Sequence, residues 1–183
     1  MKIENINTER FILRKVEKED CNEIFEILSD VKVNENLNMD LHTSKQDTLN
    51  LIEDYLEEYV KGFKFPFAIL EKDTNTLVGV FLIKLDLYDE DCFEFTIYIN
   101  KSHWGKGIYT EVLPYMIKFA FEEIKTGNFR GFVKEKNKAS SKVLSRSGFI
   151  LEKVFEVPGL EGKIESYLIK KEQYEKNIKK LGL

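Results

Sequence analysis

Two glycines that flank a single lysine are the residues whose type and spacing most clearly suggest chemistry. Gly105 and Gly107, with Lys106 between them, follow an apolar run that is typical of a β-strand, and a helical pattern begins directly after them. A strand, a glycine loop and a helix start together present backbone N–H groups to a phosphate. Glycine has no β-carbon, so a phosphate can approach the backbone closely. The sequence therefore predicts a phosphate-binding loop.

The loop matches neither of two widespread nucleotide-binding motifs. A P-loop would continue with Gly-Lys-Ser or Gly-Lys-Thr, and a dinucleotide fingerprint would place a third glycine three residues further on. Neither pattern is present here. Taken alone, Gly-Lys-Gly is more often an ordinary turn, and Lys106 is equally well explained as a phosphate contact or a solvated side chain.

The surrounding chain predicts helices and strands that would position this loop. Strands are expected at 10–16, 65–70, 77–85, 93–99, 129–135, 150–157 and 163–170. A first helix is expected to begin at about residue 19, and further helices are expected at 44–62, 108–125 and 138–146. Thr43 or Ser44 can cap the second helix, and Gly62 can end it. Residues 31–43 lack periodicity and are expected to form a loop, and Pro114 is expected to kink the third helix. The order favours an α/β (α+β) domain with one mixed sheet.

Composition and charge exclude several classes of protein. The 183 residues suggest one domain, and 43% hydrophobic with 33% charged residues is ordinary for a globular protein. The formal net charge of -4 argues against nucleic acid as the main partner, which requires a basic surface. No run approaches the roughly 20 apolar residues of a membrane span. No signal-peptide pattern is seen at the start.

The cysteines and histidines give no support for metal binding. Cys21 and Cys92 are far apart and show no spacing pattern, which fits free thiols in a reducing compartment. Only two histidines occur, His42 and His103, and neither lies near a cysteine in the sequence. We therefore expect a cytoplasmic protein with no metal, no nucleic-acid partner and no membrane segment.

Several longer blocks give the glycine loop a more specific context. They are TERFILRKVEKED at 8–20, FAILEKDTNTLVGVFLI at 67–83, EFTIYINKSHWGKGIYTEVL at 94–113 and NKASSKVLSRSGF at 137–149. In this order they resemble the opening strand, the second and third strands, the acetyl-CoA motif and the Asn-x-x-Ser helix of the GNAT N-acetyltransferase superfamily. The resemblance is closer to its ribosomal-protein N-terminal acetyltransferase (Rim-type) branch. It extends over residues 8 to about 170.

The resemblance implies a fold and a co-substrate. The fold is a single GNAT-type N-acetyltransferase domain over residues 1–183. Its one mixed, mostly antiparallel sheet has about six to seven strands with flanking helices, and strands four and five splay apart. The co-substrate is acetyl-CoA, and no metal is needed. The implied cofactor-binding residues are Ile97 and Ile99 through their main chain, the loop Trp104, Gly105, Lys106, Gly107, Ile108 and Tyr109, and Asn137 and Ser140.

The resemblance also implies a reaction, in which a primary amine attacks acetyl-CoA directly in a ternary complex. Glu94 occupies the strand start where many members carry a base. Many relatives have a tyrosine acid seven residues after the Asn, but Leu144 stands there in this chain. Ser140 is the nearest replacement, with Tyr109 and Tyr98 as further candidates. Tyr109 also stands where the family usually has Gly or Ala.

The acceptor and the oligomeric state stay open. The acceptor is a protein N-terminus or a small amine such as a polyamine, amino sugar or antibiotic, and it would be selected by the helices at about 20–62. An acidic turn could attract a cationic amine, or it could simply be solvated; it contains Asp86, Asp89, Glu90 and Asp91. The chain could be a monomer or a homodimer. A non-catalytic acyl-CoA-binding module with the same fold is the main alternative, and a purely structural domain is a weaker one.

Overall fold

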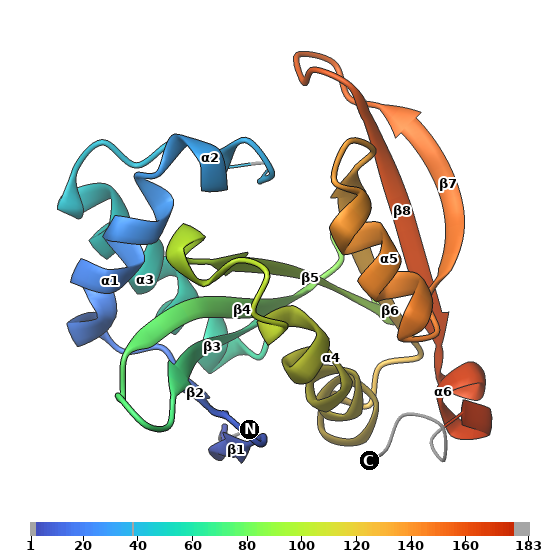
Figure 1. Ribbon diagram of the computed structural model, residues 1–183. Helices are drawn as coiled ribbons and strands as arrows, with labels where there is room; N and C mark the ends of the chain where they lie inside the picture. Colours follow the sequence, from blue (N-terminus) through green and yellow to red (C-terminus); the bar gives the residue numbers. More distant parts are fainter. Residues whose placement is uncertain (1–2, 38, 178–183) are drawn as a thin grey trace. The chain divides into compact units, whose positions relative to one another are not determined.

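The structure is a computed structural model that describes residues 3–37 and 39–177 (Figure 1). The described chain forms two compact units. The first comprises residues 3–37, 39–84 and Ile97–Ile108, and the second comprises Leu85–Thr96 and 109–177. The chain passes between the units at the end of strand β4 (Leu77–Leu85), within strand β5 (Cys92–Ile99) and at the start of helix α4 (Ile108–Lys118).

The first unit is built on antiparallel strands. Besides β4, they are β1 (Ile6–Asn7), β2 (Phe11–Lys15) and β3 (Lys64–Glu71). β1 pairs with β2, β2 with β3, and β3 with β4, all antiparallel, with a shift of the β3–β4 register between Ile69 and Leu70. The β3–β4 pair is the hairpin expected from the sequence.

The helices of the first unit are α1 (Cys21–Leu28), α2 (Val31–Asn34) and α3 (Lys45–Lys61). Ser44 caps α3 through a capping box, in which its hydroxyl accepts from the Asp47 N–H while the Asp47 carboxylate accepts from the Ser44 N–H. Gly62 ends α3 with a φ of 80°, in the left-handed region that glycine adopts readily. Both boundaries confirm the predicted helix.

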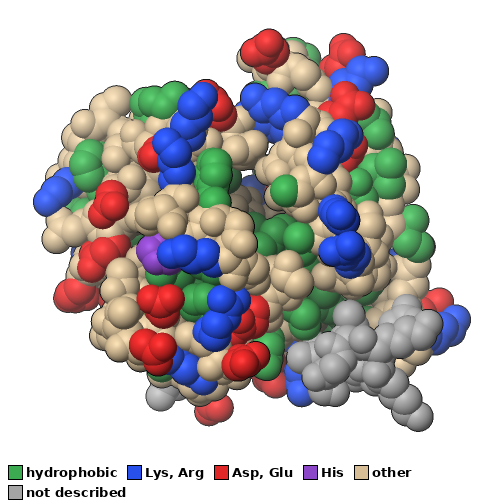
Figure 2. Space-filling view, in the orientation of Figure 1, with side chains coloured by type: hydrophobic (Ala, Val, Ile, Leu, Met, Phe, Trp, Pro, Cys, Tyr) green, Lys and Arg blue, Asp and Glu red, His purple; other side chains and the backbone are tan. Residues whose placement is uncertain are grey.

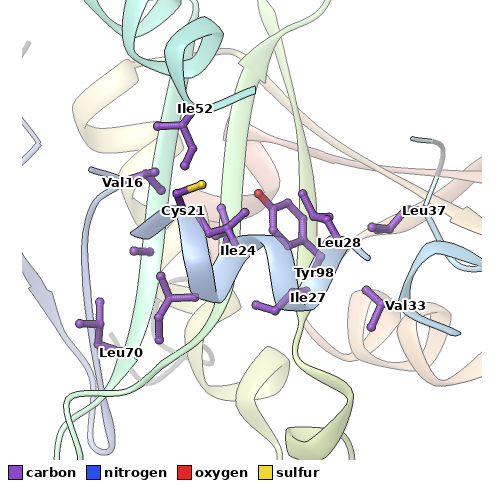
Figure 3. Packing of buried hydrophobic residues seen from close by; sticks show 13 residues of the cluster. Val16, Cys21, Ile24, Ile27, Leu28, Val33, Leu37, Ile52, Leu70 and Tyr98 are labelled. Carbon is purple, nitrogen blue, oxygen red and sulfur yellow. The ribbon is translucent and has the colours of Figure 1, made fainter. Parts of the chain in front are cut away.

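The core of the first unit lies between the helices and the sheet. Figure 3 shows side chains of α1, such as Ile24 and Leu28, together with Ile52 of α3 and Tyr98 of β5. Ala68 and Val80 of the sheet belong to the same buried cluster. Burial of such apolar surface contributes roughly 25 cal/mol per Å². Packing on these side chains therefore holds α1 and α3 over the strands.

The second unit contains both parallel and antiparallel pairing. β5 runs parallel to β6 (Asn128–Lys134), from the pair Cys92 and Asn128 to the pair Phe95 and Gly131. β6 pairs antiparallel with β8 (Lys163–Lys170), which pairs antiparallel with β7 (Ile150–Glu156). The mixed, mostly antiparallel pairing expected from the sequence is confirmed.

Aromatic side chains fill the core of the second unit. The ring centroids of Phe95 and Phe129 are 4.9 Å apart, and those of Phe121 and Tyr174 are 5.0 Å apart. Helix α4 passes through Pro114 and continues as a π-helical segment from Phe119 to Ile124. Helices α5 (Lys138–Arg146) and α6 (Lys171–Asn177) complete the unit.

Two sequence-based expectations about the elements are wrong. The described chain has eight strands rather than six to seven, because the short β1 precedes the first predicted strand. Residues 31–43 are not entirely a loop, because α2 forms there. The Asp30 carboxylate accepts from the Lys32 N–H at 2.7 Å, and this cap stabilises the single helical turn. Within residues 3–37 and 39–177, no helix has the length and apolar character needed to cross a membrane.

Candidate active site

The predicted phosphate loop has the backbone conformation that requires glycine. Gly105 and Gly107 have φ values of 75° and 77°, in the region that residues with a β-carbon rarely adopt. The residues Trp104–Gly107 are exposed, and Ile108, the first residue of α4, is buried. The loop thus lies at the surface directly before a helix N-terminus, as a phosphate-binding loop would.

Two side chains hold carbonyl groups before the loop and within it. The indole N–H of Trp104 donates to the Ile99 carbonyl at 2.9 Å, which ties the loop to the end of β5. The Arg10 guanidinium donates to the Lys106 carbonyl, also at 2.9 Å. Sequence reasoning missed Arg10, because the contact joins residues 96 positions apart and no local pattern marks it.

The main-chain groups at the end of β5 alternate between the two edges of the strand. The Asn100 N–H donates to the Val78 carbonyl of β4 at 2.8 Å. Because main-chain groups alternate along a strand, those of Ile97 and Ile99 point toward the opposite edge of β5. These are the two residues expected to pair with pantetheine. Each of them offers one N–H and one carbonyl. Of these four groups, the Ile99 carbonyl already accepts a hydrogen bond from the Trp104 indole N–H.

Glu94 lies in the half of β5 that belongs to the second unit. It alternates with buried Phe93 and Phe95, so its half-buried side chain lies on the other face of the strand. In the register with β6, Glu94 lies opposite Arg130. The position of Glu94 at the start of the strand is the one expected for the base.

Two of the four carboxylates in the acidic turn before β5 make structural contacts. The buried Asp86 pairs with the guanidinium of Arg130, whose Nε lies 3.6 Å from Glu152. The Asp91 carboxylate accepts from the Gly127 N–H at 2.7 Å. These two carboxylates therefore stabilise the second unit, which limits the part that the turn can play in attracting an amine.

Cys92 is not available as a nucleophile. Its side chain is fully buried, and burial raises the pKa of its thiol to about 12. A protonated, buried thiol does not attack an acyl group. This agrees with a reaction that needs no covalent enzyme intermediate.

Asn137 forms the N-cap of α5. Its side-chain oxygen accepts from the Ser140 N–H at 3.2 Å. The capping role considered from the sequence is confirmed, and it places Asn137 and Ser140 side by side in the first turn. Along the same helix, the exposed side chains Lys138, Lys142 and Arg146 follow at four-residue spacing, and basic side chains are visible along α5 in Figure 2.

Replacing Asn137 by Ala is expected to destabilise the protein by about 1 kcal/mol, because the Ser140 N–H loses its cap. Thermal unfolding of the purified variant measures the loss. Asn137→Asp keeps a capping oxygen and serves as the control, and it should retain most of the stability. Equal losses in the two variants would contradict the capping role.

The position of the missing acid is filled by the hydrophobic core. Leu144 is fully buried, and a β-carbon at Gly131 would come within 3.4 Å of its side chain. Tyr98 is 2% exposed and packs in the core of the first unit, where burial raises the pKa of its hydroxyl. Burial also raises the pKa of Tyr109. Tyr98 is therefore a poor candidate for a general acid, and the half-buried Ser140 stays a prediction.

A buried carboxylate that the sequence did not single out anchors α5. Glu165 of β8 accepts from the Ser141 hydroxyl at 2.6 Å, from the Tyr167 hydroxyl at 2.9 Å and from Lys138 at 3.1 Å. Burial alone would raise the pKa of Glu165, but these hydrogen bonds outweigh it and lower the pKa below its ordinary value. Glu165 thus fixes the first turn of α5, which carries Asn137 and Ser140.

Replacing Glu165 by Gln is expected to lower the free energy of unfolding at pH 7 by about 1–3 kcal/mol. A carboxylate whose pKa is lowered by folding stabilises the protein above its unfolded pKa, and this contribution is lost as pH falls through the folded pKa. The difference between wild type and variant should therefore shrink at acid pH. Urea unfolding at pH 7 and pH 3 measures it, and a difference that grows at pH 3 would contradict the lowered pKa.

The histidines make local contacts. The His42 Nδ1 lies 2.8 Å from the Thr48 hydroxyl, and the His103 Nδ1 lies 2.9 Å from the Ser102 hydroxyl beside the loop. Among the residues that the structure describes, no group of three or more His, Cys, Asp or Glu side chains could hold a metal ion.

Comparison with known proteins identifies the family. The model of the acetyltransferase (GNAT) domain matches residues 10–150, which include parts of both units. The chain belongs to the GNAT acetyltransferase family. The GNAT fold, the acyltransferase class and acetyl-CoA as co-substrate, all expected from the sequence, are thereby confirmed.

Individual relatives agree with this assignment. This GNAT acetyltransferase is 25% identical over 147 residues to the uncharacterized N-acetyltransferase p20 of Bacillus licheniformis. The matched region covers 80% of this chain and 83% of p20. RimJ of Mycobacterium smegmatis, in complex with CoA-disulfide, has a similar structure with a TM-score of 0.81 at 18% identity, covering 97% of this chain and 94% of RimJ.

A second solved structure was determined with a polyamine bound. Spermidine N-acetyltransferase from Vibrio cholerae, in complex with CoA and spermine, matches with a TM-score of 0.79 at 18% identity, covering 91% of this chain and 98% of that one. GNAT acetyltransferases thus act on protein or small-molecule amines. The presence of RimJ among the similar structures agrees with the resemblance to the Rim-type branch.

Proposed function

We propose that this protein transfers the acetyl group of acetyl-CoA to a primary amine through the residues described above. The observation that carries the proposal is the loop in which Gly105 and Gly107 both adopt positive φ before the N-terminus of α4. Such a loop exposes backbone N–H groups where no β-carbon obstructs an anion. It therefore fits the pyrophosphate of coenzyme A.

The same units supply further groups that suit the co-substrate. In the first unit, the main chain of Ile97 and Ile99 would pair with the pantetheine amides. The loop residues Trp104, Gly105, Lys106, Gly107, Ile108 and Tyr109 would hold the pyrophosphate. In the second unit, Asn137 and Ser140 would contact the cofactor beside the exposed basic side chains of α5. We also infer that residues 1–183 act as one acetyltransferase domain, because the family match includes both units.

Acetyl-CoA supplies an acetyl thioester, which an amine can attack only when the amine is neutral. Glu94 would accept the proton of the bound ammonium, directly or through a water molecule. Ser140 would donate a proton toward the departing thiolate. With Cys92 buried and protonated, direct attack by the amine requires no acyl-enzyme.

The acceptor is a protein N-terminus or a small amine. Relatives with the same fold include ribosomal-protein acetyltransferases and a spermidine acetyltransferase. The helices α1, α2 and α3 and their connections, which cover the expected acceptor region at about 20–62, do not decide between these classes. The free, buried thiols of Cys21 and Cys92 support the expected reducing, cytoplasmic location.

Thiol release from acetyl-CoA tests the proposal against a panel of N-terminal peptides, polyamines and amino sugars. We expect release that depends on the acceptor, with the acetylated product identified by mass spectrometry. Tight binding of acetyl-CoA without release for any acceptor would instead favour the non-catalytic binding module. The buried Leu144 at the acid position is the observation that favours this alternative. Failure to bind acetyl-CoA would overturn both.

A further inference from the structure

The contact between Arg10 and the glycine loop has a consequence for cofactor binding. Arg10 precedes β2 (Phe11–Lys15) and reaches the loop through its guanidinium, which donates to the Lys106 carbonyl at 2.9 Å. Its second terminal nitrogen lies 3.6 Å from the place where a β-carbon on Gly107 would be. The guanidinium therefore contacts one side of the loop at its central peptide.

This contact determines which way the central peptide faces. The described chain contains no cis peptide bonds, and in a trans peptide the carbonyl and the following N–H point in opposite directions. With the Lys106 carbonyl held by Arg10, the Gly107 N–H must point away from the guanidinium. The Trp104 indole N–H holds a second carbonyl, that of Ile99 at the end of β5. With its carbonyl held by Arg10, the central peptide directs its N–H away from the guanidinium, where it can face an anion.

We propose that Arg10 is a positioning residue that preorganises the loop for the pyrophosphate by holding the Lys106 carbonyl. The proposal rests on the proposed function, since it assumes that the loop binds coenzyme A. A charged donor on a carbonyl is stronger than a neutral hydrogen bond. The planar guanidinium also approaches with a fixed geometry that an ammonium group does not reproduce. The loop then pays little conformational entropy when the cofactor binds.

The variants Arg10→Met and Arg10→Lys test this role, because only Lys keeps the charge. Both are expected to raise the Kd for CoA and the KM for acetyl-CoA by roughly 10-fold, the effect of losing a hydrogen bond to a charged group. The kcat should stay unchanged. S-acetylpantetheine lacks the pyrophosphate, so its kcat/KM should be the same for both variants and wild type. In the absence of cofactor, amide exchange over residues 104–109 should be faster in both variants.

A matched variant separates charge from positioning. Lys106→Met removes a charge from the same loop but keeps the carbonyl that Arg10 holds, so amide exchange should remain at the wild-type rate. Wild-type Kd in Arg10→Lys would show that only the charge matters and would overturn the proposal. An equal loss with S-acetylpantetheine, or unchanged exchange in both Arg10 variants, would also overturn it. If the wild-type protein binds no CoA, the proposed function is refuted. The comparison of amide exchange between wild type and the Arg10 variants would still decide whether Arg10 holds the loop.

Discussion

Replacing Glu94 by Gln is expected to lower turnover by roughly 100-fold or more, because a positioned general base contributes about 10²–10⁴ to the rate. The amide keeps the size of the side chain but cannot accept the proton of the ammonium group. The Kd for acetyl-CoA should not change, since Glu94 is not among the residues expected to bind it. Steady-state thiol release and calorimetric titration measure the two quantities.

The control for this variant is a carboxylate far from the proposed chemistry. Glu123 is exposed on the π-helical segment after α4, and Glu123→Gln should keep wild-type turnover. Raising the pH should partly restore the activity of Glu94→Gln, because more of the amine is then neutral before it binds. Normal turnover of Glu94→Gln at neutral pH would remove Glu94 as the base.

Replacing Gly107 by Val is expected to raise the Kd for acetyl-CoA by more than about 100-fold. Since about 1.4 kcal/mol of binding free energy corresponds to a factor of 10 in Kd, this is a loss of more than about 2.8 kcal/mol. The sequence suggested that a β-carbon would meet the pyrophosphate. In the structure, the β-carbon would also point toward Arg10, 3.6 Å from its guanidinium. Valine at a φ of 77° is strained, and its methyl groups would push Arg10 off the Lys106 carbonyl. Titration with CoA measures the loss.

A graded series checks the physical cause. Alanine at position 107 fits at 3.6 Å from Arg10 and carries only the backbone strain of about 1–2 kcal/mol, so its effect should be intermediate. Gly159→Val introduces the same kind of strain at a φ of 83° in the turn between β7 and β8, and it should leave cofactor binding intact. Tight binding by Gly107→Val would count against the assignment of the loop.

Most of the elements were predictable because their signals are local. The cap of α3 at Ser44, its end at Gly62 and the hairpin of β3 and β4 each depend on neighbouring residues. Helix α2 was not predictable from periodicity, because a single turn is too short to show a helical repeat of apolar residues. Its formation depends instead on the cap at Asp30. The two-residue strand β1 was missed for the same reason.

The sequence by itself determined the family, the glycine loop before α4 and the cap at Asn137, since each is encoded in a contiguous block with a fixed residue spacing. Only the tertiary structure showed that Arg10 holds the Lys106 carbonyl, that Arg130 binds Asp86 and that Glu165 anchors α5. These contacts join residues 96, 44 and 24 or more positions apart, and no local propensity reports on them. The buried position of Leu144 was likewise decided by packing, because burial depends on which strands and helices meet rather than on the residue alone.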